Sequence, residues 1–305
     1  MDTVAFDYYQ TGQMPMGVRT LEDAALTDPA QQRDVVFRVH YPAENGPHPV
    51  IVYSHGALCS VASYDRLAAY WAARGYVVVV PEHLDAAGRP GAEPMPDLQT
   101  LLSTRVRDLS FAADAVPELA AAAGMPDLFS TRQFAVGGHS FGALTAMIKT
   151  GVKLQPGMYQ FDGPTADERF VATVSMSGVG LLPPMTDDAF SGLTGPLIAT
   201  GGTLDEGNVG AGPVYPWEWR LTPFALSPAG DKFRLVLELA DHYFGGLMGR
   251  DEPGENPDPE GLAIVAATTT AFLDAYLHRS EAARDWLVQT DLAALTEGRA
   301  TLQEK

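Results

Sequence analysis

Three polar residues lie far apart in the sequence, in an order that is typical of nucleophilic catalysis. Ser140 lies in the segment GGHSFGA, Asp205 follows GPLIATGGTL, and His242 follows FRLVLELAD. A serine hydroxyl is a weak nucleophile, so it needs a base to take its proton, and the base needs an acid to orient it. The sequence therefore predicts Ser140 as nucleophile, His242 as base and Asp205 as acid, provided that the fold brings them together.

The residues around Ser140 predict the sharp turn that such a nucleophile requires. RQFAVGG has the composition of a short strand, GHSFG is typical of a turn, and ALTAMIKT has the pattern of a helix. Gly138 and Gly142 leave room for the strand and the helix to approach each other around a strained serine. The GxSxG pattern alone also fits an ordinary glycine-rich turn, so the functional interpretation depends on the partners of the serine.

Other residues compete for the roles of acid and base. Glu206 is the main alternative to Asp205, whereas Asp241 directly precedes His242 and could not easily reach its Nδ1. Apart from His242, the only histidine after the serine is His278, which is expected near the end of the C-terminal helix. His242 is therefore the one good candidate for the base, whereas Glu206 remains an alternative to Asp205 for the acid.

The five earlier histidines have other interpretations. His40, His48 and His83 lie on or near early strands, where a histidine is most often structural. His55 and His139 flank glycine turns and could line the same cleft, although we expect the ring of His139 to point away from the bend.

An oxyanion hole would complete the machinery, because acyl transfer develops negative charge on the carbonyl oxygen. One donor is predicted to be the backbone N–H of Phe141, the residue after the nucleophile. The second is predicted in the loop HGALCS after the strand VIVYS, where Gly56 permits a tight turn and Ala57 supplies the N–H. The chain has no HGGG segment, so its hole is not of the kind built by that tract.

Substrate contacts are predicted at three apolar residues. Leu58 follows Ala57 in the oxyanion loop, and Trp217 and Trp219 lie in GPVYPWEWRLTPFALSP, between the acid and the base. These two rings either pack a helix onto the sheet or form a wall of an apolar acyl or aryl pocket. No long insertion follows the strand that ends near Ser177, which favours an open cleft for short- to medium-chain esters.

Strand and helix patterns alternate along the whole chain. Strands are predicted at about Val35–Tyr41, Val50–Ser54, Tyr76–Pro81, Gln133–Val136, Val171–Ser175, Leu197–Thr200 and Arg234–Leu239. Helices are predicted at about Ser63–Arg74, Leu98–Ala122, Ser140–Thr150, Trp217–Ala225, Gly261–His278 and Ser280–Leu295, with loops at 88–96, 153–169, 207–216 and 251–260. This order predicts an α/β fold, a mostly parallel sheet with helices on both faces. We expect one domain over residues 1–305 and no large separate lid domain.

Composition restricts the classes of partner. The 305 residues have 46% hydrophobic content and a formal net charge of -18, which makes nucleic acids and anionic membrane surfaces unfavourable partners. The single cysteine, Cys59, rules out an internal disulfide framework and is expected to be a small packed residue. The chain has neither an N-terminal secretory pattern nor an apolar run of transmembrane length, so a cytoplasmic location is expected.

The ordered set VIVYSHGA, GYVVVVPEH, VGGHSFGALTA, GTLDEG and ADHYFGG resembles the α/β-hydrolase superfamily. Within it, the SHG turn and the opening GVRTLEDAALTDPAQQRDVVFRVHYPA are similar to the predicted dienelactone hydrolase and platelet-activating-factor acetylhydrolase-like group, which is also similar to bacterial polyester hydrolases. The resemblance covers about Gly17–His278. It implies an α/β-hydrolase fold and the same five site positions: Ser140, Asp205, His242, Ala57 and Phe141.

The predicted activity is that of a serine carboxylesterase acting on a small-molecule ester through an acyl-serine intermediate. Because the base must be neutral, activity should fall as the pH drops through about 6 to 7. The alternatives are a non-catalytic hydrolase-fold binding module, or a peptidase, thioesterase or acyltransferase that uses the same residues. No cofactor or metal is expected, since the chain has no HExxH pair and GNVGAG lacks the strand and helix of a phosphate loop.

Overall fold

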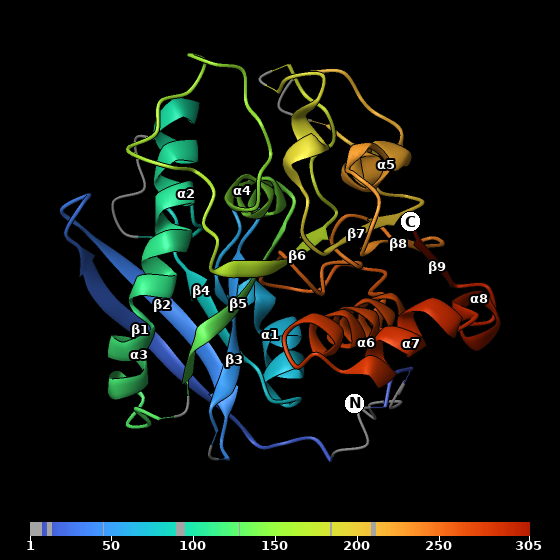
Figure 1. The fold of residues 1–305 in the computed structure, drawn as a ribbon, viewed down its shortest axis with the longest axis horizontal. Coiled ribbons are helices and arrows are strands. Elements are labelled where there is room, and N and C mark those ends of the chain that lie inside the picture. Colours follow the sequence, from blue (N-terminus) through green and yellow to red (C-terminus); the bar gives the residue numbers. More distant parts are fainter. Residues whose placement is uncertain are drawn as a thin grey trace.

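A nine-stranded sheet runs through the part of the chain that the structure, a computed structural model, describes (Figure 1). The described residues are 8–10, 14–44, 46–89, 95–127, 129–183, 185–208 and 212–305, without the side chains of 131–133. Parts of the loops predicted at 88–96 and 207–216 therefore lie outside the described residues.

The strands follow the order β1-β2-β4-β3-β5-β6-β7-β8-β9 across the sheet. Strands β3 to β8 are mutually parallel, while β1, β2 and β9 pair antiparallel with their neighbours. Their bounds are β1 (Val18–Asp28), β2 (Arg33–Pro42), β3 (His48–Ser54), β4 (Val77–Pro81), β5 (Phe129–His139), β6 (Phe170–Met176), β7 (Leu197–Gly202), β8 (Lys232–Leu237) and β9 (Ala300–Glu304).

Helices cover both faces of this sheet (Figure 1). On β3, Ile51 and Tyr53 belong to the apolar cluster shared with α1 and α6, whereas Val50 and Val52 belong to the cluster shared with α2 and α3. Successive side chains of a strand point to opposite faces, so an unbroken apolar run fills both layers at once. The helices are α1 (Asp65–Ala72), α2 (Leu98–Asp114), α3 (Val116–Ala122), α4 (Phe141–Lys149), α5 (Thr222–Leu226), α6 (Pro259–Tyr276), α7 (Glu281–Gln289) and α8 (Leu292–Leu295), with 3-10 turns at Ala62–Tyr64, Ala189–Gly192 and Trp217–Leu221.

All seven predicted strands are confirmed, and the sequence analysis missed two strands at the edges of the sheet. Most residues of β1 are exposed or only partly buried, and its pairing with β2 is irregular between Leu21 and Ala24, so it has no unbroken apolar run. β9 is short and also partly exposed. The helix predicted over 98–122 is two helices that meet at Ala115, because Pro117 opens the first turn of α3.

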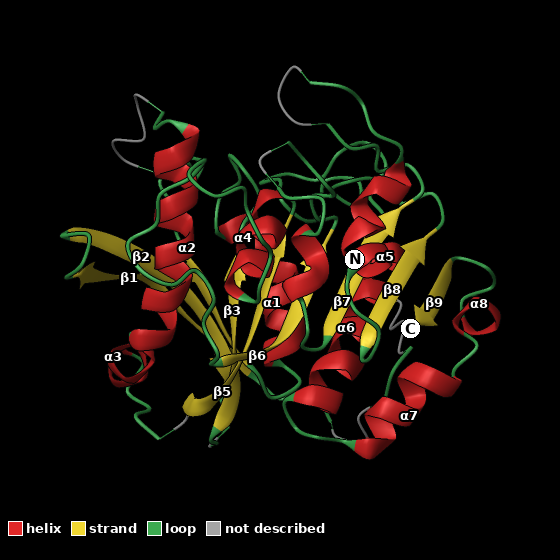
Figure 2. Cartoon of the chain, turned by 45° about the horizontal axis from the view of Figure 1, so that its top comes forward, coloured by secondary structure: helices red, strands yellow, loops and turns green. Residues whose placement is uncertain are grey.

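The parallel arrangement brings four strand ends to one edge of the sheet. β3 and β5 align Ser54 with Gly138, and β5 and β6 align His139 with Met176. Figure 2 shows loops gathered at the end toward which β7 and β8 point. The loops that carry residues 57, 140, 205 and 242 all begin there, which is where open parallel sheets hold their sites.

A helix that crosses a membrane is long and almost entirely apolar. Within the described residues, no helix combines the length and the apolar character that crossing a membrane requires.

Candidate active site

Ser140 occupies the sharp bend between β5 and α4. Its backbone has φ 56° and ψ -118°, a conformation that residues other than glycine rarely adopt. Its N–H donates to the carbonyl of Met176 at 3.0 Å, which holds the bend against β6. The strained serine between a strand and a helix is the geometry of a nucleophile elbow.

Two glycines make this bend possible. A Cβ at position 142 would lie 2.0 Å from the carbonyl oxygen of Ser54, and a Cβ at position 138 would lie 2.3 Å from the backbone of Gly142. No side chain fits at such distances, so the glycine spacing seen in the sequence is a packing requirement. It also brings the first turn of α4 against the end of β3.

Asp205 and His242 are joined by a hydrogen bond. His242 Nδ1 lies 2.8 Å from Asp205 Oδ1, with Asp205 buried and the His242 side chain 17% exposed. An ionised carboxylate only accepts, so Nδ1 carries the proton and Nε2 keeps a free lone pair. The competing acids do not make this contact: the Glu206 side chain is exposed, and Asp241 accepts the N–H groups of residues 243 and 245.

Ser140 and His242 line one cavity of about 710 Å³. Ala57, Leu58 and Phe141 line the same cavity. The structure thus brings the predicted nucleophile, base, oxyanion residues and one predicted substrate contact to a common space, with Asp205 behind the base.

The two predicted tryptophan contacts lie elsewhere. Neither tryptophan is among the described residues that line the cavity. The Trp219 ring stacks on the Tyr215 ring with 4.6 Å between centroids, and its Nε1–H donates to the carbonyl of Leu181 at 3.1 Å. Trp217 packs against a small apolar cluster that includes Phe224 and Val236. These rings therefore pack the segment 215–224 onto the sheet, as the alternative interpretation held. The apolar wall comes instead from residues that the sequence analysis did not single out: Met95, Leu98, Leu101, Leu102, Leu144, Leu154, Val179 and Leu182.

Arg220 is a further site residue that the sequence analysis missed. It is buried, and its Nε and Nη2 each lie 3.1 Å from Asp205 Oδ1, the oxygen that also accepts from His242. It also donates to the carbonyls of Ser177, Gly178 and Glu206. Burial lowers the pKa of the Arg220 guanidinium, and the carboxylate of Asp205 opposes that shift. The only signal in the sequence is a charged residue inside the aromatic segment WEWRL.

A buried hydrogen-bond network joins the loops that carry the predicted oxyanion residue, nucleophile and base. Tyr64 Oη accepts the N–H of Gly56 at 2.9 Å and lies 2.8 Å from His139 Nδ1, while His139 Nε2 lies 2.9 Å from the carbonyl oxygen of His242. Because that carbonyl only accepts, Nε2 carries the proton and Tyr64 donates to Nδ1. Burial lowers the pKa of His139, which keeps its ring neutral. Contrary to expectation, this ring therefore points toward the base and lines the cavity.

The oxyanion loop is held by an ion pair beneath it. Arg105 donates to both carboxylate oxygens of Asp85, to the carbonyl of His55 at 2.8 Å and to that of Gly56 at 3.3 Å. His55 Nδ1 lies 2.7 Å from the same Gly56 oxygen. Since the Gly56 carbonyl and the Ala57 N–H belong to one peptide plane, these contacts orient the predicted oxyanion donor. Burial tends to raise the pKa of Asp85, but Arg105 outweighs it and holds the value at about 2.

A second Ser-His-Asp set lies below this loop. His83 Nε2 is 2.8 Å from Ser54 Oγ, and His83 Nδ1 is 2.9 Å from Asp108 Oδ2. All three side chains are inaccessible to solvent and none lines the described cavity. Burial raises the pKa of Asp108 to about 6 and lowers that of His83 well below its usual value. A substrate could not reach this set, so we interpret it as a structural element under the site.

The fold and these features agree with the comparison to known families. A family model described as Chlorophyllase matches residues 4–150, a span that contains the oxyanion loop and Ser140. The chain has the α/β-hydrolase fold and is similar to this family over residues 4–150. The match supports an ester hydrolase of this class, and Asp205 and His242 lie beyond the matched residues. The comparison with curated proteins found no match to this α/β-hydrolase.

The network through Tyr64 leads to a first prediction for this α/β-hydrolase. Tyr64→Phe leaves the buried N–H of Gly56 without its acceptor, which should reduce the free energy of unfolding by about 1–3 kcal/mol. Tyr53→Phe is the matched control, because among the described residues the neighbouring Tyr53 hydroxyl donates only to the sulfur of Met176. Denaturant titration measures both, and an equal loss in the two variants would contradict the role given to Tyr64.

The contact of Arg220 with Asp205 leads to a second prediction. Removing the cation in Arg220→Gln lets the carboxylate stabilise the imidazolium form of His242 more strongly. The protonated base is inactive, so the acid limb of the kcat/KM profile should move to higher pH by up to about one unit, and less in Arg220→Lys. The position of the limb does not depend on the amount of folded enzyme. A limb that stays at the wild-type pH in Arg220→Gln would show that Arg220 acts only on folding.

Proposed function

We propose that this α/β-hydrolase is a serine carboxylesterase that cleaves short- to medium-chain or aryl carboxylic esters. The observation that carries the proposal is the 2.8 Å hydrogen bond between Asp205 and His242 in a site where His242 and the strained Ser140 line one cavity. A serine at a sharp bend, a histidine lining the same cavity and a buried acid bonded to that histidine are the parts that acyl transfer through serine requires.

In the proposed mechanism, His242 Nε2 takes the proton of Ser140 Oγ as the oxygen attacks the ester carbonyl carbon. Asp205 keeps the imidazole in the correct tautomer and stabilises the imidazolium that forms. The backbone N–H groups of Ala57 and Phe141 stabilise the tetrahedral oxyanion. His242 then protonates the departing alcohol. A water molecule gives a proton to the same nitrogen as its oxygen attacks the acyl carbon, and the imidazolium returns this proton to Ser140 Oγ as the acid is released.

The shape of the cavity supports the proposed substrate class. Its apolar wall is formed largely by leucines of α2, α4 and the 154–182 region, and its volume of about 710 Å³ lies within the usual range for small-molecule sites. Ser140 and His242 also line this cavity, so the ester group would lie at these residues and its hydrocarbon part against the leucines.

Hydrolysis of p-nitrophenyl butyrate tests this proposal. The wild type should turn it over and Ser140→Ala should lose at least about three orders of magnitude in kcat. Ser54→Ala should retain most of the turnover. It removes the hydroxyl of the second Ser-His-Asp set, which is buried and which a substrate could not reach. Since a histidine base works only when neutral, kcat/KM should fall on going from about pH 8 to about pH 5.

Circular dichroism on each variant separates lost chemistry from lost folding. No turnover of oxygen esters or of a matched thioester by the folded wild type would support a non-catalytic binding module instead. Turnover of the thioester alone would place the enzyme among thioesterases.

A further inference from the structure

Arg250 lies between the loop that carries the predicted base and the loop that carries the oxyanion residue. Its guanidinium sits 3.4 Å from the ring centroid of Tyr243, the residue after His242. Its Nη1 donates to the carbonyl of Gly249 at 2.9 Å and lies 4.0 Å from the sulfur of Cys59, two residues after Ala57. Arg250 lines the same cavity as Ser140.

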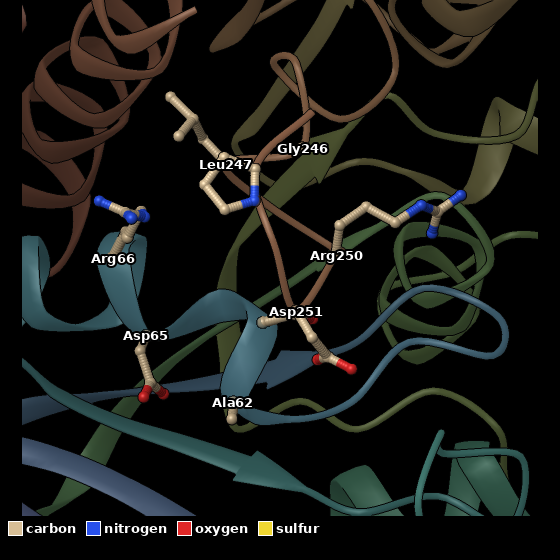
Figure 3. Close-up of a pocket in the computed structure, with 9 residues that line it drawn as sticks. Ala62, Asp65, Arg66, Gly246, Leu247, Arg250 and Asp251 are labelled. Carbon is tan, nitrogen blue, oxygen red and sulfur yellow. The ribbon is translucent and has the colours of Figure 1, made fainter. Parts of the chain in front are cut away.

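The Arg250 guanidinium has no acidic partner in the described part of the chain: no carboxylate there lies within ion-pair distance of it. The neighbouring Asp251 side chain diverges from it (Figure 3) and accepts a hydrogen bond from Ser60. By contrast, Arg105 and Arg220 are neutralised by Asp85 and Asp205. Arg250 is thus an exposed cation in the cavity wall that has no ion-pair partner among the described residues, in a protein with a net charge of -18.

The surroundings of Arg250 also hold it ready for a ligand. Stacking on Tyr243 and the bond to Gly249 restrict the side chain, so little conformational entropy remains to be lost on binding. The N–H of Gly249 donates to the carbonyl of Ser63 at 3.1 Å, which anchors this segment to the 3-10 turn before α1. A restrained guanidinium with free N–H groups is the group that binds a carboxylate in two parallel hydrogen bonds.

We propose that Arg250 forms a subsite for a carboxylate carried by the ester substrate, so that the enzyme accepts esters with an apolar part and an anionic end. This inference rests on the proposed esterase function and specifies its substrate class. The apolar part lies against the leucine wall and the anion against Arg250, on the side of Tyr243 and Cys59. A monoanion fits better than a dianionic phosphate, because Glu206 lines the same cavity and repels the higher charge.

A pair of esters with equal acyl length tests this proposal: the p-nitrophenyl monoester of adipate, which ends in a carboxylate, and p-nitrophenyl hexanoate, which is neutral. The quantity measured is the ratio of their kcat/KM values on one enzyme, so the fraction of folded protein cancels. Arg250→Gln should lower the anionic-to-neutral ratio about three- to tenfold, and Arg250→Lys less. Added salt should bring the wild-type ratio closer to that of Arg250→Gln, because it screens the attraction by Arg250, whereas the repulsion by the net charge of -18 is screened in both enzymes.

Arg66→Gln is the matched control. Arg66 also has no ion pair among the described residues, but it lies on α1 and lines an adjacent cavity rather than the one that contains Ser140 (Figure 3). The anionic-to-neutral ratio of kcat/KM in Arg66→Gln should equal that of the wild type. Hydrolysis of both esters with an unchanged ratio in Arg250→Gln would overturn the subsite and leave the esterase standing, whereas a wild type that cleaves neither ester would overturn both.

Discussion

The contact between the first turn of α4 and the end of β3 is the constraint on which the rest of the site depends. Only a glycine at position 142 lets the helix come so close to the carbonyl of Ser54. That approach sets the sharp bend at Ser140 and places the loop after β3 beside the loop after β5. One packing contact thereby brings the predicted oxyanion loop beside the predicted nucleophile, and the hydrogen bonds of Arg105 then orient that loop.

Buried charges stabilise the loops that this packing brings together. Arg105 binds the carbonyls before Ala57, and Arg220 binds Asp205 and the carbonyls after β6 and β7. An arginine can satisfy several backbone acceptors at once, while the paired carboxylate keeps its own charge compensated in the interior. The two arginines thus hold the backbone dipoles of these loops in fixed positions, which is what electrostatic stabilisation of a transition state requires. The neutral network through Tyr64 and His139 adds a direct link from the oxyanion loop to the base.

Local patterns predicted the central strands, the elbow and the order of nucleophile, acid and base, because each depends on a few neighbouring residues and on the parallel topology. Arg220, Tyr64 and His139 were beyond such patterns, since their roles arise from contacts between segments far apart in the chain. The tryptophans show the same limit: WEW suggested a pocket wall, yet Trp219 packs against Tyr215. The partly exposed strand β1 lacked an apolar run, so only its pairing with β2 reveals it.

The most direct measurement of whether Ser140 is an activated nucleophile is covalent labelling with an alkyl fluorophosphonate, read by mass spectrometry of the digested protein. An activated serine attacks the phosphorus and displaces fluoride, so we expect one adduct, on the peptide that contains Ser140, and much slower labelling in His242→Ala. Labelling at another serine, or none in the folded wild type, would show that Ser140 is not the activated nucleophile. The same adduct rate in His242→Ala would show that the serine is not activated by this histidine.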